Sequence, residues 1–447
     1  MMPHFTRRQI LFLGAGGLLG ALAPDWLRAA GGSGSSADES AEKAHREIWR
    51  RFVAEDGTLL DYTDYAGKVI LPTPEDCRDN KPNALGWWTP IENGSMFGGS
   101  YMDALCTRWR LKREPEIAAQ ARRLAGGLEK LGSVGKVPGF LARGFATDGV
   151  SHYGASSDDQ SYPWFYGMWS YLTSGIPDDA ERQRLSALVE KIALGFEENQ
   201  WGFLCEAPGF GKFGSWDGAH CDANARLLFV IRATYEVTRN KKWLDLYNQK
   251  KIEKRGPDKL TRIELCAAGS HYVAPGENPN YPLHPPIWTS ASSQAALRAL
   301  SELDEDPAVR AQFAEGLKRN AANALPHFKL WNQYNEAEAG KLAFNIDWRS
   351  LSEPASGWKP QTTIKEAFQV GSNQWTPWKK LSPRRIYENN HMRDSFYAAW
   401  VIFLSKDAEI IDSIRGEFAE ALAHFDWSKL YTVTFFTAEN AYWRAQG

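Results

Sequence analysis

The chain has 447 residues, of which 43% are hydrophobic and 24% charged, and its formal net charge at pH 7 is −2. These values are ordinary for a soluble globular protein and exclude wholesale disorder. Without a basic excess, a nucleic-acid-binding protein is not indicated. The unusual count is 19 Trp, beside 16 Tyr and 22 Phe. Flat aromatic surfaces in this number suit sugar rings, although they also suit a large core.

The first thirty residues have the pattern of an export signal. Arg7 and Arg8 lead into an apolar stretch over 10–23 that is too short to cross a bilayer comfortably. This predicts a twin-arginine signal peptide over 1–30 and a flexible leader over 31–40, with an uncleaved anchor as the alternative. We therefore expect the twin-arginine export machinery to deliver a folded protein to the periplasm or the medium. No later apolar run reaches the length of a membrane span, so no stable membrane insertion is expected after signal removal.

The cysteines carry little functional signal. The chain has five, and none shows the C-x-x-C spacing of a zinc or redox motif. We interpret them as mainly structural, and an odd number leaves at least one thiol free unless a bridge joins two chains. They are Cys77, Cys106, Cys205, Cys221 and Cys266.

Residues 41–447 are predicted to form one helical domain. Leu185, Val189, Ile192 and Phe196 show the 3.6-residue spacing of a single buried stripe, and similar stripes recur along the chain. A short leading helix is expected to leave His45 exposed. The predicted helices cover 41–53, 97–112, 115–131, 161–174, 183–197, 221–237, 241–254, 290–304, 307–323, 392–405 and 407–424.

The predicted helices come in pairs joined by short turns, with Pro at several helix starts. First members of the pairs begin near residues 97, 161, 221, 290 and 392. Five pairs, with a sixth that the two chain ends could build, predict an all-α fold: an (α/α)6-type toroid, a closed ring of helical hairpins. The Trp-rich stretch 326–390 breaks the rhythm, and we expect long loops there, laid over one mouth and interrupted at most by a short helix. One short strand is predicted over 431–436.

Polar and aromatic clusters precede the first helix of each pair. In a ring of alternating up and down helices, equivalent loops open at the same end, so five distant clusters would line one funnel. Each cluster also has a purely structural interpretation, because Ser, Asp and Asn are common helix caps. The clusters lie at 87–94, at Arg143 with 151–160, at 216–222, at 281–288 and at 387–394.

The hairpin pattern, the segment ENGSMFGGSYMDAL at 92–105 and the Trp-rich loops resemble the (α/α)-toroid carbohydrate-active proteins. These are the six-hairpin glycosidase superfamily and the related polysaccharide lyases. The resemblance covers roughly 42–445. It implies a cleft at one mouth of the ring, where glycosidases of this superfamily commonly use two carboxylates, but it transfers no individual residue.

A glycoside hydrolase needs one protonated carboxyl group and one carboxylate across the scissile bond. Adjacent side chains point in different directions, so we expect the catalytic pair to come from different loops. The candidates are Asp158 or Asp159 opposite Asp217 or Asp222, with Glu388 next. The candidate substrate-binding residues are Trp88, Glu92, Asn93, Arg143, His152, Tyr153, Gln160, Trp164, Trp216, His220, Trp288, Asn390, His391 and Arg393.

Two other functions stay open. A polysaccharide lyase would eliminate across a uronate with a His or Tyr base, for which His152, Tyr153 and His220 have the right chemistry. A non-catalytic carbohydrate-binding protein would keep the aromatic platforms without needing the acids. No cofactor or metal is expected, because Asp217-x-x-His220-x-Asp222 is not an established ligand spacing and no phosphate-loop or G-x-S-x-G motif occurs.

Overall fold

The computed structural model describes residues 36–272, 286–353 and 357–447. The predicted signal peptide, half of the leader and most of the 281–288 cluster lie outside these ranges. Helix α2 (Ala37–Arg51) begins within the predicted leader, because Ser36 caps it and its alanines pack into the core. None of the helices in the described ranges is long and apolar enough to cross a membrane.

Six inner helices of the described chain form a closed ring. Each packs against the next in chain order, and the last returns to pack against the first. Five of them begin within three residues of the predicted starts. They are α4 (Gly94–Lys112), α6 (Asp158–Leu172), α8 (Cys221–Thr238), α11 (Ile287–Leu303), α17 (Asp394–Leu404) and α19 (Phe436–Gln446).

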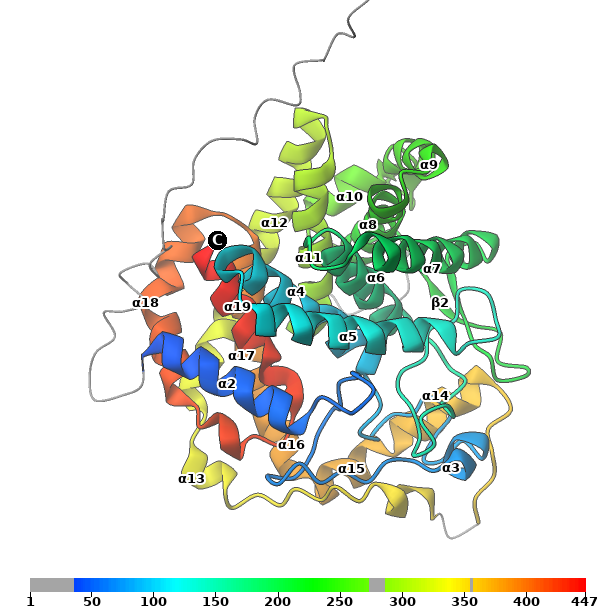
Figure 1. The fold of residues 1–447 in the computed structure, drawn as a ribbon, viewed down its shortest axis with the longest axis vertical. Coiled ribbons are helices and arrows are strands. Elements are labelled where there is room, and N and C mark those ends of the chain that lie inside the picture. The colour runs from blue at the N-terminus through cyan, green and yellow to red at the C-terminus, as the bar shows by residue number, and fades with distance from the viewer. Residues whose placement is uncertain (1–35, 273–285, 354–356) are drawn as a thin grey trace, which may run out of the picture.

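An outer helix backs each inner one (Figure 1). The sixth hairpin joins α19 to α2, so the two chain ends build it, as the sequence suggested. The fold is an (α/α)6 toroid, which confirms the predicted class. Besides α2, the outer helices are α5 (Pro115–Ser133), α7 (Asp179–Glu198), α9 (Lys241–Lys251), α12 (Pro307–Phe328) and α18 (Ala408–His424).

Inner and outer helices are joined by short turns at one end of the ring. Asp178, Asn240, Asp306 and Asp407 each accept a hydrogen bond from a backbone N–H in the first turn of the outer helix that follows. Such caps satisfy donors that would otherwise be unpaired at a helix start. The longer connections, which carry the polar clusters, therefore all lie at the opposite end.

Two local predictions were wrong. The strand expected over 431–436 is a single bridge between Thr432 and Tyr62, followed by a 3-10 turn and α19. The stretch 326–390 contains more helix than expected, and Pro383 starts one of its helices instead of marking a loop. Its helices are α13 (Glu336–Ala339), α14 (Ile364–Asn373), α15 (Trp375–Leu381) and α16 (Pro383–Glu388), along the lower edge of Figure 1.

The remaining short elements lie in the connections between hairpins. They are α3 (Pro74–Arg78), α10 (Arg262–Ala268), and two antiparallel hairpins, β1–β2 (Gly202–Leu204 with Lys212–Ser215) and β3–β4 (Lys254–Arg255 with Leu260–Thr261).

His45 is buried, which contradicts the expected exposure. Its Nδ1 lies 3.0 Å from Glu439 Oε2 on α19 and 3.0 Å from Tyr101 Oη on α4. The helix that carries His45 faces the ring because the chain ends form the sixth hairpin. Burial alone would lower the pKa of His45, but Glu439 outweighs it and the pKa is raised. The five cysteines are all buried and free.

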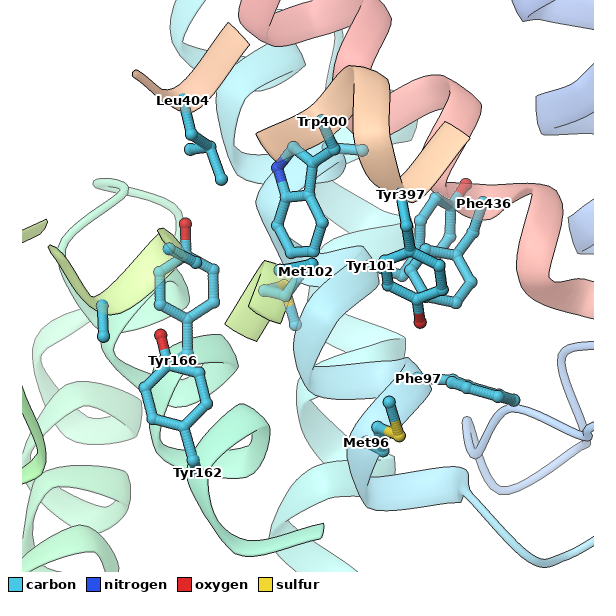
Figure 2. Packing of buried hydrophobic residues seen from close by; sticks show 14 of the residues in the cluster. Met96, Phe97, Tyr101, Met102, Tyr162, Tyr166, Tyr397, Trp400, Leu404 and Phe436 are labelled. Carbon is cyan, nitrogen blue, oxygen red and sulfur yellow. The ribbon is translucent and has the colours of Figure 1, made fainter. Parts of the chain in front are cut away.

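The centre of the ring is held by the buried carboxylate of Asp103 on α4. It accepts hydrogen bonds from Tyr166 Oη on α6 (2.7 Å), from Trp400 Nε1 on α17 (3.0 Å), and from Arg444 Nε (3.0 Å) and Nη2 on α19. Figure 2 shows the rings of Tyr166 and Trp400 among the side chains that fill the ring. Burial alone would raise the pKa of Asp103, but the Arg444 ion pair and these bonds lower it. One ionised carboxylate therefore joins four inner helices.

Asp103→Asn should be strongly destabilising. It leaves the Arg444 guanidinium buried without its counter-ion, and breaking a buried pair from one side costs about 3–5 kcal/mol. Urea unfolding should show this loss. Asp412→Asn is the control: Asp412 pairs with Arg415 on the surface and its side chain is 64% exposed, so we expect a change below about 1 kcal/mol. Equal stabilities of the two variants would contradict the proposed role of Asp103.

Candidate active site

A cavity of about 410 Å³ opens at the mouth where the inner helices begin. Its lining comes from the segment before α4, from the first turns of α4, α6, α11 and α17, from α15 and α16, from the turn over Asn389–Arg393, and from the segment before α19. The lining residues are Asp61, Trp87, Trp88, Glu92, Asn93, Met96, Phe97, Asp159, Trp288, Trp375, Arg385, Ile386, Asn389, Asn390, Arg393, Tyr397, Thr432 and Thr434.

Hydrogen bonds between the helix starts fix the shape of this mouth. Asn93, at the start of α4, donates its backbone N–H and its side-chain amide to the two oxygens of Asp61 (2.8 and 2.6 Å). Gln160 of α6 donates to Asn93 Oδ1 (2.9 Å) and accepts from the N–H of Met96 (3.2 Å). The first turns of α4 and α6 and the segment around Asp61 therefore form one connected unit.

Three carboxyl groups line the cavity, from Asp61, Glu92 and Asp159. Glu92 accepts a hydrogen bond from the backbone N–H of Trp88 (2.8 Å), and Asp159 accepts one from the hydroxyl of Ser157. Burial, followed by the negative charge of Glu92, raises the pKa of Asp61 to about 8, against the opposing effects of Arg385 and Asn93. The raised pKa favours the protonated form of Asp61 at neutral pH.

Trp88 forms a wall of the cavity with its backbone at φ +73°. This left-handed conformation is costly for a large side chain and persists only where the surroundings fix it. Here the backbone oxygen of Trp88 accepts from Tyr62 Oη (2.6 Å), its indole donates to Gly371 O (2.9 Å), and Trp375 packs against it with ring centroids 5.1 Å apart. The result is a fixed aromatic surface on which Trp375 is 36% exposed.

A π-helical turn over Asn389–Arg393 precedes α17. Such turns are rare and occur frequently at functional sites. This one places Asn389, Asn390 and Arg393 in the cavity lining. Arg393 pairs with Asp394 (2.8 Å), and its guanidinium lies 6.0 Å from the ring centroid of Trp288.

Seven of the residues singled out from the sequence meet in this cavity. They come from four of the five clusters, so the predicted convergence of distant loops on one mouth holds for these members. They are Trp88, Glu92, Asn93, Asp159, Trp288, Asn390 and Arg393.

Four of the five candidate catalytic carboxylates lie outside the lining. Asp158 is bound by Arg226 and by the indole of Trp216, and burial, chiefly, raises its pKa. Asp217 is half-exposed and pairs with Arg255 and Arg262 (2.6 and 3.0 Å). Asp222 is buried and accepts from the hydroxyls of Ser270 and Ser293 (3.0 and 2.6 Å).

The fourth candidate outside the lining, Glu388, is fully buried. It pairs with Arg384 (3.2 Å) and accepts from the N–H groups of Tyr431 and Thr432. Burial raises the pKa of Glu388. Its contacts hold the segment before α19, including the lining residue Thr432, but Glu388 itself does not line the cavity.

Several predicted binding residues instead support the mouth. Arg143 is buried and donates to Glu92 O (3.2 Å), Ala155 O (3.1 Å) and Ser157 Oγ (2.7 Å), which ties the segment before α4 to that before α6. Gln160 joins α4 to α6, as described above. Both residues position the cavity lining without belonging to it.

The other predicted binding residues lie elsewhere. Trp164 donates to Leu128 O, Trp216 packs on Phe196, and His152 pairs with Glu206. Tyr153 is buried and donates to Lys81 O, His220 caps α8, and His391 packs on Tyr387, where burial lowers its pKa.

Asp61, Arg385 and Tyr397 were missed. Asp61 and Arg385 lie in stretches without a clear helical period, and Tyr397 falls within the predicted helix 392–405 without any feature that singles it out. The only sequence signal for Asp61 was an acidic residue directly after Leu59 and Leu60 in an irregular segment. Within the described ranges, no three His, Cys, Asp or Glu side chains gather as a metal site requires.

Comparisons with known proteins add a distant likeness. Neither a family model nor a curated protein sequence matches the chain. Among solved structures, the chain is similar to the glycoside hydrolase family 76 (mannosidase) protein Bt3792 from Bacteroides thetaiotaomicron VPI-5482, with a TM-score of 0.41 and 12% sequence identity. The match covers 91% of this chain and 97% of that one.

The raised pKa of Asp61 should make folding stability depend on pH. With a pKa of about 8 in the folded protein and 3.8 in the unfolded chain, Asp61 holds its proton more tightly when folded. Its contribution is therefore greatest below about pH 4 and is lost as the pH rises toward 8. We expect the Tm of the unmodified protein to fall over this window relative to Asp61→Asn, whose side chain does not titrate. Tm is measured by scanning calorimetry at a series of pH values. If the plots of Tm against pH were parallel for the unmodified protein and Asp61→Asn, the raised pKa would be contradicted.

Proposed function

We propose that this protein is a glycoside hydrolase that cleaves an oligo- or polysaccharide in the cavity at the mouth of the ring. The observation that carries the proposal is the coexistence, in one cavity, of a protonated carboxyl group, other carboxylates and exposed indole surfaces. Glycosidic bond hydrolysis needs the first two, and sugar rings pack on the third.

We assign Asp61 as the proton donor and Asp159 as the partner carboxylate. Asp61 has a raised pKa and lines the cavity. Asp159 lies in the first turn of α6, where the helix dipole favours a negative charge. Asp158 also has a raised pKa and is the second choice for the donor, because it does not belong to the cavity lining.

The lyase alternative is less well supported. Its chemistry needs a His or Tyr base beside a uronate, and no histidine is found among the described residues that line the cavity. Tyr397 does line it, but burial raises the pKa of this tyrosine above its usual value, which disfavours it as a base. His152, Tyr153 and His220 are engaged elsewhere. A lyase would also release an unsaturated sugar with ultraviolet absorbance, whereas a hydrolase would release only a reducing end.

Export remains part of the proposal. We propose that the twin-arginine signal over 1–30 directs the enzyme to the periplasm or the medium, where a polysaccharide substrate is accessible. The paired Arg7 and Arg8 ahead of a short apolar stretch support this.

Substitution of the two assigned carboxylates should separate their roles. Asp159→Asn should abolish detectable turnover. Asp61→Asn should lower kcat by about 10²–10⁴-fold on natural glycans, but far less on aryl glycosides, whose leaving groups need no protonation. Reducing-sugar release and aryl-alcohol release measure the two effects.

The matched control for both is Asp412→Asn, a surface acid remote in sequence from every lining residue. If Asp158→Asn shows the leaving-group dependence and Asp61→Asn does not, the proton donor is Asp158. If neither Asp159→Asn nor any donor variant changes turnover, the hydrolase mechanism proposed here is wrong.

A further inference from the structure

Two buried donors in the cavity lining lack hydrogen-bond partners. Arg385 is 9% exposed and Tyr397 is 1% exposed. Arg385 Nη1 and Tyr397 Oη are both shielded from solvent, and neither has a partner among the residues that the structure describes. Figure 2 shows Tyr397 beside Tyr101 and Phe436, with Phe97 and Met96 nearby on α4.

Buried polar atoms in native proteins are nearly always hydrogen-bonded, so each exception calls for a physical reason. Such exceptions occur elsewhere in this chain, as at Tyr162 Oη. What distinguishes Arg385 and Tyr397 is that both side chains line the same cavity. A ligand that enters this cavity can supply the missing partners.

Arg385 is held so that its guanidinium does not bond to the acids beside it. Its Nη2 lies 3.9 Å from Asp61 Oδ2 and 3.6 Å from Glu92 Oε2, which is too far for hydrogen bonds. Three aromatic rings surround the guanidinium carbon, those of Tyr62 (5.6 Å), Trp378 (5.8 Å) and Trp88 (5.9 Å). Cation–π contacts of this kind hold the planar group without using its N–H donors.

We propose that Arg385 and Tyr397 bind hydroxyl groups of a neutral sugar unit at the floor of the cavity, and so help to select the substrate. This inference rests on the proposed function and names the substrate class of the same site. A sugar hydroxyl can accept a hydrogen bond from Arg385 or Tyr397 while it donates one to Glu92 or Asp159. Since both donor atoms are shielded in the free protein, binding requires a small movement of these side chains.

Charge balance favours a neutral sugar over a uronate. Arg393 is already paired with Asp394, and Arg385 faces Glu92 and Asp61. Even with Asp61 protonated, the carboxylates of Glu92, Asp159 and Asp394 outnumber the two guanidiniums. A uronate carboxylate would add a further negative charge to a site whose described residues already carry more carboxylates than guanidiniums, whereas a hydroxyl adds none.

The decisive variant is Tyr397→Phe, which removes only the unpartnered hydroxyl. Because that hydroxyl has no partner among the described residues, its removal should leave Tm unchanged or raise it. Binding of neutral sugar should nevertheless weaken about tenfold, as expected for the loss of one hydrogen bond. Tyr162→Phe is the matched control, since Tyr162 Oη is also buried and has no partner among the described residues, but lies outside the lining. The affinity of Tyr162→Phe for the neutral sugar should equal that of the parent protein.

Arg385→Lys supplies the second variant. It keeps the positive charge beside Asp61 but loses the planar set of donors, so we expect affinity to fall by about tenfold or more. All variants are compared by calorimetric titration in the full-length Asp159→Asn background, in which binding is measured without turnover. The probes are linear neutral hexose trisaccharides and uronate trisaccharides of the same length.

The expected result is binding of at least one neutral trisaccharide that weakens in Tyr397→Phe and Arg385→Lys but not in Tyr162→Phe. Tighter binding of uronates, unchanged affinity in both variants, a marked drop in Tm for Tyr397→Phe, or no binding of any neutral probe would each overturn the inference. The expected binding pattern in a protein that never cleaves a glycan would support the sugar-binding floor and contradict the hydrolase proposal, so the two failures are distinguishable.

Discussion

The ion pair between Asp103 and Arg444 is the interaction on which the ring depends, because it joins the first inner helix to the last. Tyr166 and Trp400 complete the set of donors. Asp103, Tyr166 and Arg444 each lie eight or nine residues after the start of their helix, a depth of about 12–14 Å at 1.5 Å per residue. Helices that meet at equal depth present their first turns at equal height. A shared mouth is therefore the geometric consequence of a shared centre.

At that mouth the helix starts are connected through polar side chains instead of apolar packing. Asp61 binds Asn93 at the start of α4, Gln160 of α6 bonds to the same Asn93, and Arg143 ties Glu92 to Ser157. Each helix start supplies unpaired backbone N–H groups that need an acceptor. The acids that satisfy these donors lie where a ligand would enter. Positioning and chemistry are therefore coupled at Asp61, whose carboxyl group anchors α4 and also holds a proton at neutral pH.

The sequence predicted the ring well and the site in part. Inner helices have long, strongly periodic stretches with polar residues at their starts, so five starts were placed within three residues. We expected all five clusters to share the funnel, but no residue of the 216–222 cluster lines the cavity. There, Arg255 of the β3–β4 hairpin and Arg262 of α10 bind Asp217 and hold it away from the cavity. Asp61 and Arg385 could not be found from periodicity, because their positions depend on bridges and ring contacts between segments far apart in sequence.

The centre and the mouth of the ring differ in how fully their polar groups are satisfied. Both oxygens of Asp103 accept hydrogen bonds from buried donors, and its charge is balanced. At the mouth, Trp88 is held at positive φ, Asp61 is protonated by burial, and donors on Arg385 and Tyr397 have no partners among the described residues. Each of these features costs stability in the free protein, and each would be relieved or used by a polar ligand. A rigid, satisfied centre allows such a strained mouth to persist, because the inner helices cannot move to remove the strain without breaking the Asp103 contacts. The part of the molecule with strained backbone and unsatisfied polar groups is thus the part most suited to bind a substrate.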